Sequence, residues 1–313
     1  CSIICCTANL YNGSCNFTNS CNYNLSVNTP ANSTLTDVKW SFNYIAQGAC
    51  WLEDGAIRIT SGSCISPSAA GFYWYCNAIG GGTCTGNNIS IWSDVGSCMP
   101  APSCAPISVP FTLQFFRSCF GAAGCSGTCI GANSPWTMTL DGRTVQFTNV
   151  PNPFSLASPS VCAGSNMTAT SNGTQYGVGP YSLNWSFSPT GIPSVGTGVS
   201  PSINYPTAGV VTLYCIVTDA CGITAISSKT VNVVPIPTAN AGTPRNLTCV
   251  QTTTVLNGLG GGTYSWTGPG TITTPTSQNP TVNTPGVFSL IVNVAGCNSP
   301  AANVTVTQNT TAP

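Results

Sequence analysis

Alternating apolar and polar residues predict short β-strands along most of this chain. In its C-terminal half, residues 210–218, 230–234, 287–294 and 304–307 alternate and are bounded by Gly, Pro, Asn and Ser. This pattern is typical of half-buried strands in an antiparallel sandwich. No segment combines helix caps with an apolar stripe of 3.6-residue period. We therefore expect an all-β protein.

The N-terminal half carries similar strand signals. The predicted strands there are residues 38–45, 57–60, 72–76, 89–92, 111–116, 136–140 and 144–147. Asp141-Gly142 lies between the last two strands and predicts a hairpin turn, because this dipeptide favours positive φ. Together these segments predict a further sandwich.

Two proline motifs predict the domain boundaries, Val150-Pro151-Asn152-Pro153 and Val234-Pro235-Ile236-Pro237. Proline neither continues a helix nor fits a central strand, so both motifs are typical of stiff linkers. We predict three tandem β-sandwich domains, of which the first is rich in cysteine. They span residues 1–150, 151–236 and 237–313.

The second and third predicted domains repeat one pattern. Cys162 lies 87 residues before Cys249, and Cys221 lies 76 residues before Cys297. Further matching pairs between these are Trp185 with Trp266, Gly209 with Gly286, and Leu213 with Leu290. A slowly shrinking offset is expected of two copies of one unit that differ by loop deletions.

Several motifs in these two units resemble a known family. They are Val161-Cys162-Ala163-Gly164, Val217-Thr218-Asp219-Ala220-Cys221-Gly222, Asn240-Ala241-Gly242, Leu247-Thr248-Cys249, Tyr264-Ser265-Trp266-Thr267-Gly268-Pro269-Gly270, Asn279-Pro280-Thr281-Val282 and Pro285-Gly286. Both units resemble the PKD-like, immunoglobulin-type β-sandwich repeats of large secreted proteins of the Bacteroidetes. The resemblance implies a secreted, non-catalytic spacer or adhesive module over residues 151–313. Residues 1–150 resemble no family that we can name.

The charge composition argues against catalysis. Only 4% of the 313 residues are charged and none is histidine, whereas about 25% are charged in an ordinary soluble domain. Histidine is the usual general base and a common metal ligand. The carboxylates do not suggest an acid pair either, since adjacent Glu53 and Asp54 would point to opposite faces of a strand. We place Asp141 and Asp219 in turns and expect no catalytic residue, cofactor or metal site.

The net charge also limits the partners. It is zero, so the basic patch that nucleic acids require is absent. No stretch approaches the ~20 apolar residues of a membrane-spanning helix. A weakly charged, neutral surface favours association. We expect the chain to bind copies of itself, with glycans as a further candidate partner.

The cysteine content predicts a secreted or cell-surface protein. Nineteen cysteines occur, fourteen of them in the first 150 residues, and such numbers are typical of oxidising compartments. Matching the two repeats predicts the disulfides Cys162–Cys221 and Cys249–Cys297. Cys215 is left over, and we expect a buried thiol that behaves as a small hydrophobe. Its alternative role, an intermolecular bridge, requires exposure.

Other cysteines have more than one interpretation. Five crowd the N-terminus: Cys1, Cys5, Cys6, Cys15 and Cys21. They staple a local lobe, or they form an arm that reaches a neighbouring subunit. Cys1 is also a candidate lipid anchor, or the first residue left after removal of a targeting segment. Cys98 with Cys104, and Cys125 with Cys129, have spacings that zinc sites use, but an oxidising compartment favours disulfides.

Aromatic and asparagine residues supply the remaining candidate sites. Phe72, Tyr73, Trp74 and Tyr75 predict a strand with one face in the core. Its other face would stack on a sugar or pack on a neighbouring subunit. Candidate glycosylation sequons begin at Asn12, Asn16, Asn24, Asn32, Asn88, Asn166, Asn172, Asn184, Asn246, Asn303 and Asn309.

These observations favour a secreted structural protein that self-assembles into an extracellular filament or surface layer. The alternative is an adhesin or carbohydrate-binding segment of a larger cell-surface protein. A concave row of exposed rings would favour the alternative, and a flat apolar patch would favour assembly.

Overall fold

The structure, a computed structural model, describes residues 21–46, 55–68, 82–117, 130–132, 136–148 and 153–309. In these ranges β-strands are the main regular structure, joined by the one-turn helix α1 (Trp92–Val95) and the 3-10 turn η3 (Gly96–Cys98). The all-β prediction is confirmed. The chain forms two compact units. Unit 1 holds the described residues up to Thr148 with Thr174–Ser182 and Val217–Ala225, and unit 2 holds the rest.

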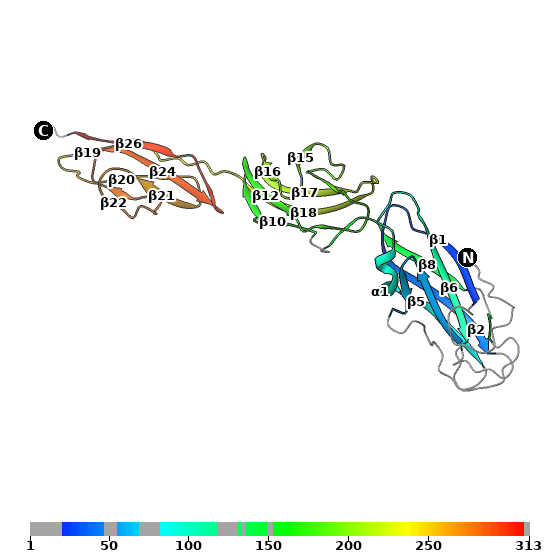
Figure 1. The fold of residues 1–313 in the computed structure, drawn as a ribbon. Coiled ribbons are helices and arrows are strands. Elements are labelled where there is room, and N and C mark those ends of the chain that lie inside the picture. The colour runs from blue at the N-terminus through cyan, green and yellow to red at the C-terminus, as the bar shows by residue number, and fades with distance from the viewer. Residues whose placement is uncertain are drawn as a thin grey trace. The chain divides into compact units, whose positions relative to one another are not determined.

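Unit 1 is built on a sandwich of two sheets, which we call the first sandwich (Figure 1). One sheet has the order β1-β6-β3-β4, with strands β1 (Cys21–Asn28), β6 (Ser108–Arg117), β3 (Gly55–Ser61) and β4 (Cys64–Ser66). In the other sheet the long strand β2 pairs with β5, β7 and β8. Their bounds are β2 (Thr34–Ala46), β5 (Thr83–Ser90), β7 (Ile130–Ala132) and β8 (Thr137–Arg143).

Aromatic rings fill the core of the first sandwich. Trp40, Phe42 and Trp136 are at most 2% exposed. The Trp40 and Phe42 rings stack with centroids 4.4 Å apart, and Trp136 meets both edge-on at 6.0 and 6.1 Å. Such pairs add to the stabilisation that burial of their area provides. The alternation of β2 thus places Trp40 and Phe42 on the core face.

The first half of unit 2 contains the middle sandwich. Its larger sheet has the order β11-β18-β17-β14-β15, with strands β11 (Ser160–Cys162), β18 (Thr224–Val234), β17 (Gly209–Thr218), β14 (Ser182–Ser186) and β15 (Ser194–Thr197). The smaller sheet has the order β10-β12-β16, with strands β10 (Phe154–Leu156), β12 (Ser165–Ser171) and β16 (Ser202–Tyr205). The last strand of the middle sandwich, β18, lies beside the penultimate strand β17, which lies beside β14. Immunoglobulin-like sandwiches have the same order.

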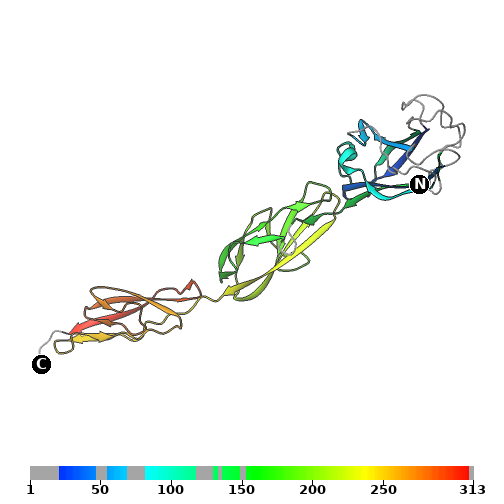
Figure 2. The ribbon, with the colours of Figure 1, turned by 90° about the horizontal axis from the view of Figure 1, so that it is seen from below.

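The third sandwich, coloured yellow to red in Figure 2, has a similar arrangement of strands. One sheet has the order β19-β26-β24-β21, with β25 beside β24, and the other has the order β20-β23-β22. The strands are β19 (Arg245–Thr248), β20 (Thr254–Val255), β21 (Thr263–Thr267), β22 (Ile272–Thr273), β23 (Thr281–Val282), β24 (Gly286–Val294), β25 (Cys297–Asn298) and β26 (Ala302–Asn309). In the middle sandwich β11, which ends at Cys162, runs parallel to the last strand β18. In the third sandwich β19, which ends just before Cys249, runs parallel to the last strand β26.

The matched residues of the two repeats occupy the same places. Trp185 and Trp266 are 0% and 3% exposed. Each indole nitrogen donates a hydrogen bond to a carbonyl, of Gly198 at 2.8 Å and of Ser277 at 3.1 Å. Since a buried indole needs such an acceptor, the repeat keeps both the ring and its partner. The four strands predicted in residues 210–307 all occur, as β17, β18, β24 and β26.

Three details of the first sandwich differ from the prediction. Asp141-Gly142 is not a turn but part of β8, where these residues pair with Asp37 and Leu35 of β2. Residues 144 and 145 precede the short strand β9 (Gln146–Phe147), which pairs with β13 (Thr174–Gln175). The strand predicted at 89–92 ends at Ser90, and Trp92 begins α1. In the first case, pairing with a distant strand overrides the local turn preference.

Candidate functional site

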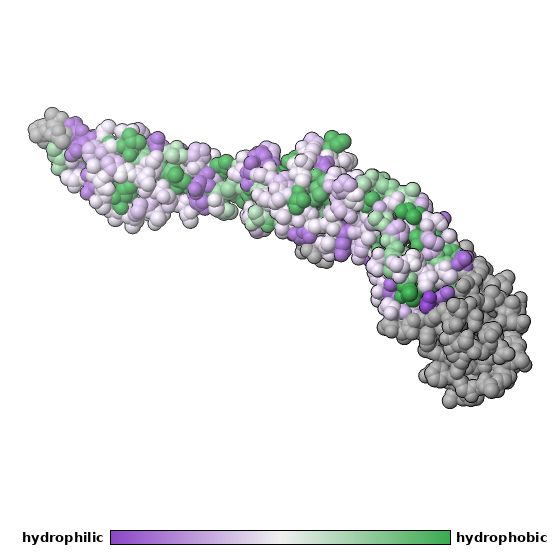
Figure 3. All heavy atoms as spheres, viewed as in Figure 1, coloured by the Kyte–Doolittle hydropathy of each residue, from purple (hydrophilic) through white to green (hydrophobic). Residues whose placement is uncertain are grey.

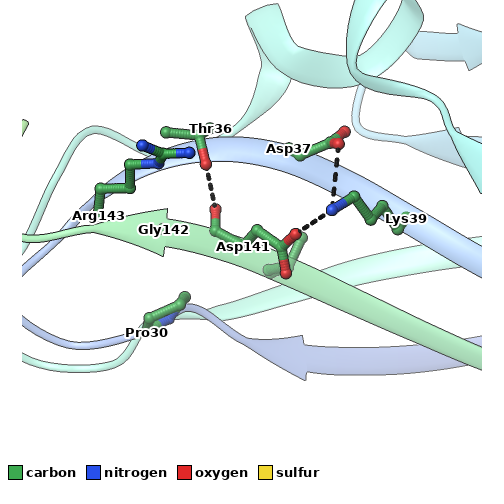
Figure 4. Close-up of a pocket in the computed structure, with 8 residues that line it drawn as sticks. Pro30, Thr36, Asp37, Lys39, Asp141, Gly142 and Arg143 are labelled. Atoms are coloured by element: carbon green, nitrogen blue, oxygen red, sulfur yellow. Dashed lines mark hydrogen bonds and ion pairs between the residues drawn. The ribbon is translucent and has the colours of Figure 1, made fainter. Parts of the chain in front are cut away.

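A group of charged side chains on β2 and β8 lines an open pocket of about 560 Å³ in the first sandwich (Figure 4). Asp37 and Lys39 come from β2, and Asp141 and Arg143 from β8. These are four of the twelve charged residues of the chain. The walls are completed by Pro30, Thr36, Leu140 and Gly142.

The register of β2 and β8 brings the charges together. Asp37 lies directly opposite Asp141. Lys39 is two residues further along β2 and lies on the same face as Asp37. The ammonium of Lys39 lies 2.5 Å from a carboxylate oxygen of Asp141 and 3.7 Å from one of Asp37. Ser90 also donates a hydrogen bond to Asp37 at 2.5 Å. The sequence prediction missed this convergence, because the two strands lie about a hundred residues apart.

The electrostatics of this group favour binding over proton transfer. The hydrogen bond to Asp141 raises the pKa of Lys39 above its usual 10.5, against the opposing effect of desolvation. A lysine with a raised pKa stays protonated at neutral pH and therefore cannot act as a base. The guanidinium of Arg143 lies 5.5 Å from the centroid of the Tyr176 ring. The pocket thus offers cationic donors and carboxylate acceptors, with no aromatic ring among its lining residues.

Asp219 organises the turn between β17 and β18, as predicted. The residue is 5% exposed. It accepts hydrogen bonds from the backbone N–H groups of Val178 at 3.1 Å and of Cys221 and Ile223 at 2.9 Å each. A buried carboxylate with three backbone donors has a structural role. It also holds the backbone beside Cys221 in place.

Disulfides differ from the predicted pairing. Cys104 pairs with Cys221, and Cys162 with Cys297, while Cys249 is an exposed free thiol. The predicted Cys162–Cys221 bridge cannot form, because the cysteines lie at opposite ends of β18. Cys162 ends β11 opposite Val234, whereas Cys221 precedes Thr224. Eleven strand residues span roughly 35 Å, far beyond the reach of a disulfide.

The same geometry separates Cys249 from Cys297. Thr248 lies opposite Asn309 at the end of β26, and Cys297 lies opposite Val294, before β26 begins. A strand the length of β26 spans roughly 25 Å. Two of the described disulfides instead join the first sandwich to the β17–β18 turn, and the middle sandwich to the third. The fourteen N-terminal cysteines therefore do not all pair with one another.

Two further cysteine predictions are tested by the described residues. Cys98 pairs with Cys64, so the spacing of Cys98 and Cys104 reflects two disulfides. Cys215 is a fully buried free thiol, which confirms the predicted small hydrophobe. Burial raises its pKa to about 12. In the described part of the chain, no three His, Cys, Asp or Glu side chains gather in the way that a metal ion requires.

Several predicted sites lie outside the described residues. These are Cys1, Cys5, Cys6, Cys15, Cys125, Cys129, Phe72, Tyr73, Trp74, Tyr75, Glu53, Asp54, Asn12 and Asn16. Cys21 opens β1, with its backbone opposite Phe115. Among the described sequons, Asn32 is half-buried. The exposed sequon asparagines are Asn24, Asn88, Asn166, Asn172, Asn246, Asn303 and Asn309.

Asn184 differs from the exposed sequons. It is half-buried, and its amide nitrogen donates to the carbonyl of Gly191 at 2.9 Å. Its carbonyl oxygen accepts from Ser194 at 2.6 Å. The nitrogen that would carry a sugar is thus already bound inside the middle sandwich.

No protein-family model matches the chain, and no curated protein matches it by sequence. Among solved structures, the fibronectin(III)-like modules of Clostridium thermocellum CbhA are similar over 50% of this chain and 94% of theirs, at 11% identity and a TM-score of 0.26. The eight N-terminal Ig domains of Down Syndrome Cell Adhesion Molecule are similar over 86% of this chain and 36% of theirs, at 12% identity and a TM-score of 0.36. The Ig1-2 module of Drosophila receptor protein tyrosine phosphatase DLAR is similar over 50% of this chain and 99% of its own, at 11% identity and a TM-score of 0.18. Our assignment of an immunoglobulin-like fold rests on the sheet topology given above.

Proposed function

We propose that this chain is a secreted, non-catalytic structural protein that self-assembles into an extracellular filament or surface layer. The observation that carries the proposal is the use of disulfides between consecutive sandwiches, Cys104–Cys221 and Cys162–Cys297. A disulfide between sandwiches restricts their relative motion, which is useful in a structural element and unnecessary for folding each core. Such bonds persist in oxidising compartments.

The surface supports this proposal. In the view of Figure 3 most of it is pale, since residues of intermediate hydropathy prevail, with scattered hydrophobic residues between them. Exposed hydrophobic residues of the described part of the chain include Ile192, Val199 and Val210, at 77%, 58% and 74% exposure. Little charge is present to keep copies apart. No helix in the described residues is long and apolar enough to cross a membrane.

Strand edges offer a route to assembly. In the described sheets, β1 and β21 are end strands. An end strand presents backbone N–H and C=O groups that a strand of another chain can pair with. Strand β1 has eight residues and β21 has five, so pairing at β1 would give the longer ladder of backbone hydrogen bonds.

Electron microscopy of the native material, before and after reduction, tests the proposal. We expect regular filaments or sheets built from this chain. Filaments that dissolve on reduction would place disulfides at the subunit contacts, and filaments that persist would place strand pairing there. Dispersed single particles under native conditions would refute self-assembly.

The second candidate function is glycan binding by a cell-surface adhesin. The charged pocket on β2 and β8 favours it, because carboxylate acceptors and cationic donors in one concavity suit sugar hydroxyls. Replacing Arg143 with Met should abolish binding to a glycan array, while Lys229→Met on β18 serves as the matched control. Unchanged binding by Arg143→Met would exclude this pocket. In that case, Tyr73 and Trp74 variants would test the predicted aromatic surface.

A further inference from the structure

Each of the two repeats places one cysteine at either end of its last strand. In the middle sandwich these are Cys162, beside the final residue of β18, and Cys221, in the turn before β18. In the third sandwich the corresponding residues are Cys249 and Cys297, at the two ends of β26. We call the first kind the end cysteine and the second kind the turn cysteine.

Both turn cysteines bond to a preceding sandwich. Cys297 pairs with Cys162, the end cysteine of the middle sandwich, with the Cα atoms 5.6 Å apart. Cys221 pairs with Cys104, in the loop before β6 of the first sandwich, with the Cα atoms 5.3 Å apart. A turn cysteine is thus bonded to the preceding sandwich twice in one chain, once through a loop cysteine and once through an end cysteine. Such a bond requires an accessible thiol on the preceding sandwich.

Cys249 meets this requirement and lacks the bond. It follows β19 directly, as Cys162 ends β11, and both strands run parallel to the last strand of their sandwich. Its thiol is free and exposed, and the neighbouring Val250 is 93% exposed. Cys215, the other free thiol of the described residues, is fully buried and cannot serve.

We propose that Cys249 forms a disulfide with the turn cysteine of another immunoglobulin-like β-sandwich domain, as Cys162 does with Cys297. The second observation, besides the exposed thiol, is that the equivalent residue of the internal repeat is bonded in this way. The partner domain belongs either to a longer form of the same polypeptide or to a separate chain. The inference holds whether or not filaments form, so it goes beyond the proposed function.

The bond forms by thiol–disulfide exchange with a dithiol oxidoreductase or a small disulfide as oxidant. The Cys249 thiolate attacks one sulfur of the oxidant's disulfide, giving a mixed disulfide and releasing one thiol. The thiolate of the turn cysteine then attacks the Cys249 sulfur and releases the second thiol. Two protein thiols are oxidised, and the oxidant takes up their two electrons and two protons.

A tandem extension tests whether the geometry repeats. Residues 235–313 are fused after residue 310, so that the fused copy follows β26 as the third sandwich follows β18. The protein is refolded with oxidised glutathione, and thiols are counted after denaturation. We expect no more thiols than in the parent chain, because Cys249 of the first copy takes the Cys297 of the fused copy. Two additional thiols would overturn the proposal.

Matched variants guard against misfolding. Cys249→Ser in the first copy should raise the thiol count of the extended protein by one, since Cys297 of the fused copy is then left over. Cys215→Ala should lower the count by one without changing the bridge. If Cys249→Ser leaves the count unchanged, Cys249 is not the partner and the proposal fails.

Native material identifies the partner. Free thiols are blocked with N-ethylmaleimide, and non-reduced peptides are sequenced by mass spectrometry. A Cys249 peptide joined to a peptide from the turn before a last strand supports the proposal, and its sequence distinguishes the same polypeptide from a separate chain. Cys249 that carries N-ethylmaleimide or a small thiol, or that is joined to a cysteine of residues 1–150, overturns it. None of these results depends on whether filaments are seen.

Discussion

At the residue scale, the interior of these sandwiches shows where polar atoms are satisfied and where they are not. The indoles of Trp185 and Trp266 both have acceptors. Among the described residues, the buried hydroxyl of Tyr205 has no hydrogen-bond partner, and the residue is 1% exposed. Burial raises the pKa of Tyr205 to about 12. An unpaired buried hydroxyl costs free energy.

We expect Tyr205→Phe to stabilise the protein, by about 1 kcal/mol at neutral pH. The gain should increase above pH 10, because the tyrosine ionises in the unfolded chain at its usual 10.0 but only near 12 in the folded one. The contribution of the neutral phenol is complete below pH 10 and is lost as the pH rises toward 12. Urea unfolding across this range measures it.

Tyr181→Phe is the control for that prediction. The hydroxyl of Tyr181 donates to the carbonyl of Tyr176 at 2.5 Å. Removal of this hydroxyl should lower the free energy of unfolding, whereas removal of the Tyr205 hydroxyl should raise it. A loss of stability in both variants would show that the Tyr205 hydroxyl has a partner.

At the element scale, pairs of strands and their turns decide which charges meet. The residue pattern predicts β2 and β8 separately, since each alternates. It does not predict their register, which depends on contacts between residues far apart in the sequence. For this reason the favourable turn dipeptide Asp141-Gly142 predicts a hairpin, whereas both residues pair with β2. Gly142 has a different role, because a Cβ atom there would lie 2.5 Å from the Ser33 hydroxyl oxygen.

Lys39→Met should weaken the pairing of β2 with β8. Without the ammonium, the carboxylates of Asp37 and Asp141 face each other across the strands, and like charges in this position are destabilising. We expect a lower urea midpoint for Lys39→Met at pH 7. Because the pKa of Lys39 is raised, its contribution to stability should persist up to pH 10.5 and be lost above it.

Lys229→Met is the matched control, since among the described residues Lys229 has no ion pair and only lies 5.8 Å from the centroid of the Phe154 ring. A Lys39→Met effect of equal size at pH 7 and well above pH 10.5 would indicate lost packing of the side chain and contradict the electrostatic account.

Asp219→Ala should destabilise the β17–β18 turn. Three backbone donors lose their acceptor, and each donor that stays buried costs about 1–3 kcal/mol. We expect a loss of about 2 kcal/mol or more in denaturant unfolding, and slower formation of Cys104–Cys221 during oxidative refolding. Asp219→Asn keeps one acceptor oxygen and should lose less. Equal losses in the two variants would argue against the hydrogen bonds as the cause.

At the scale of the whole molecule, the covalent links between sandwiches were the least predictable feature. Matching the repeats found the correct cysteine positions but the wrong partners. A repeat shows which residues are equivalent, whereas a disulfide depends on which ends of two successive sandwiches meet. The length of β18 between Cys162 and Cys221 was the missing information. A predicted last strand from Thr224 to Val234 would have excluded their pairing.

Cys162→Ser should uncouple the middle and third sandwiches. The disulfide closes a segment with a sequence separation of 135 residues, for which chain entropy gives roughly 5 kcal/mol when both sandwiches unfold together. In calorimetry we expect a lower transition temperature and a separation into two transitions. Cys215→Ala, which removes no disulfide, is the control. An unchanged thermogram for Cys162→Ser would show that the two sandwiches are coupled by other contacts.

The Cys162–Cys297 bond also has a mechanical consequence. Tension applied between residue 153 and residue 309 would pass along β11 to Cys162, cross the sulfur atoms to Cys297, and leave through β26. Everything between those cysteines, including β17, β18 and β24, would carry no load. Stretching such a chain would therefore lengthen it little until the bond is reduced, and reduction would expose two parallel strand pairs, β11 with β18 and β19 with β26, to shear.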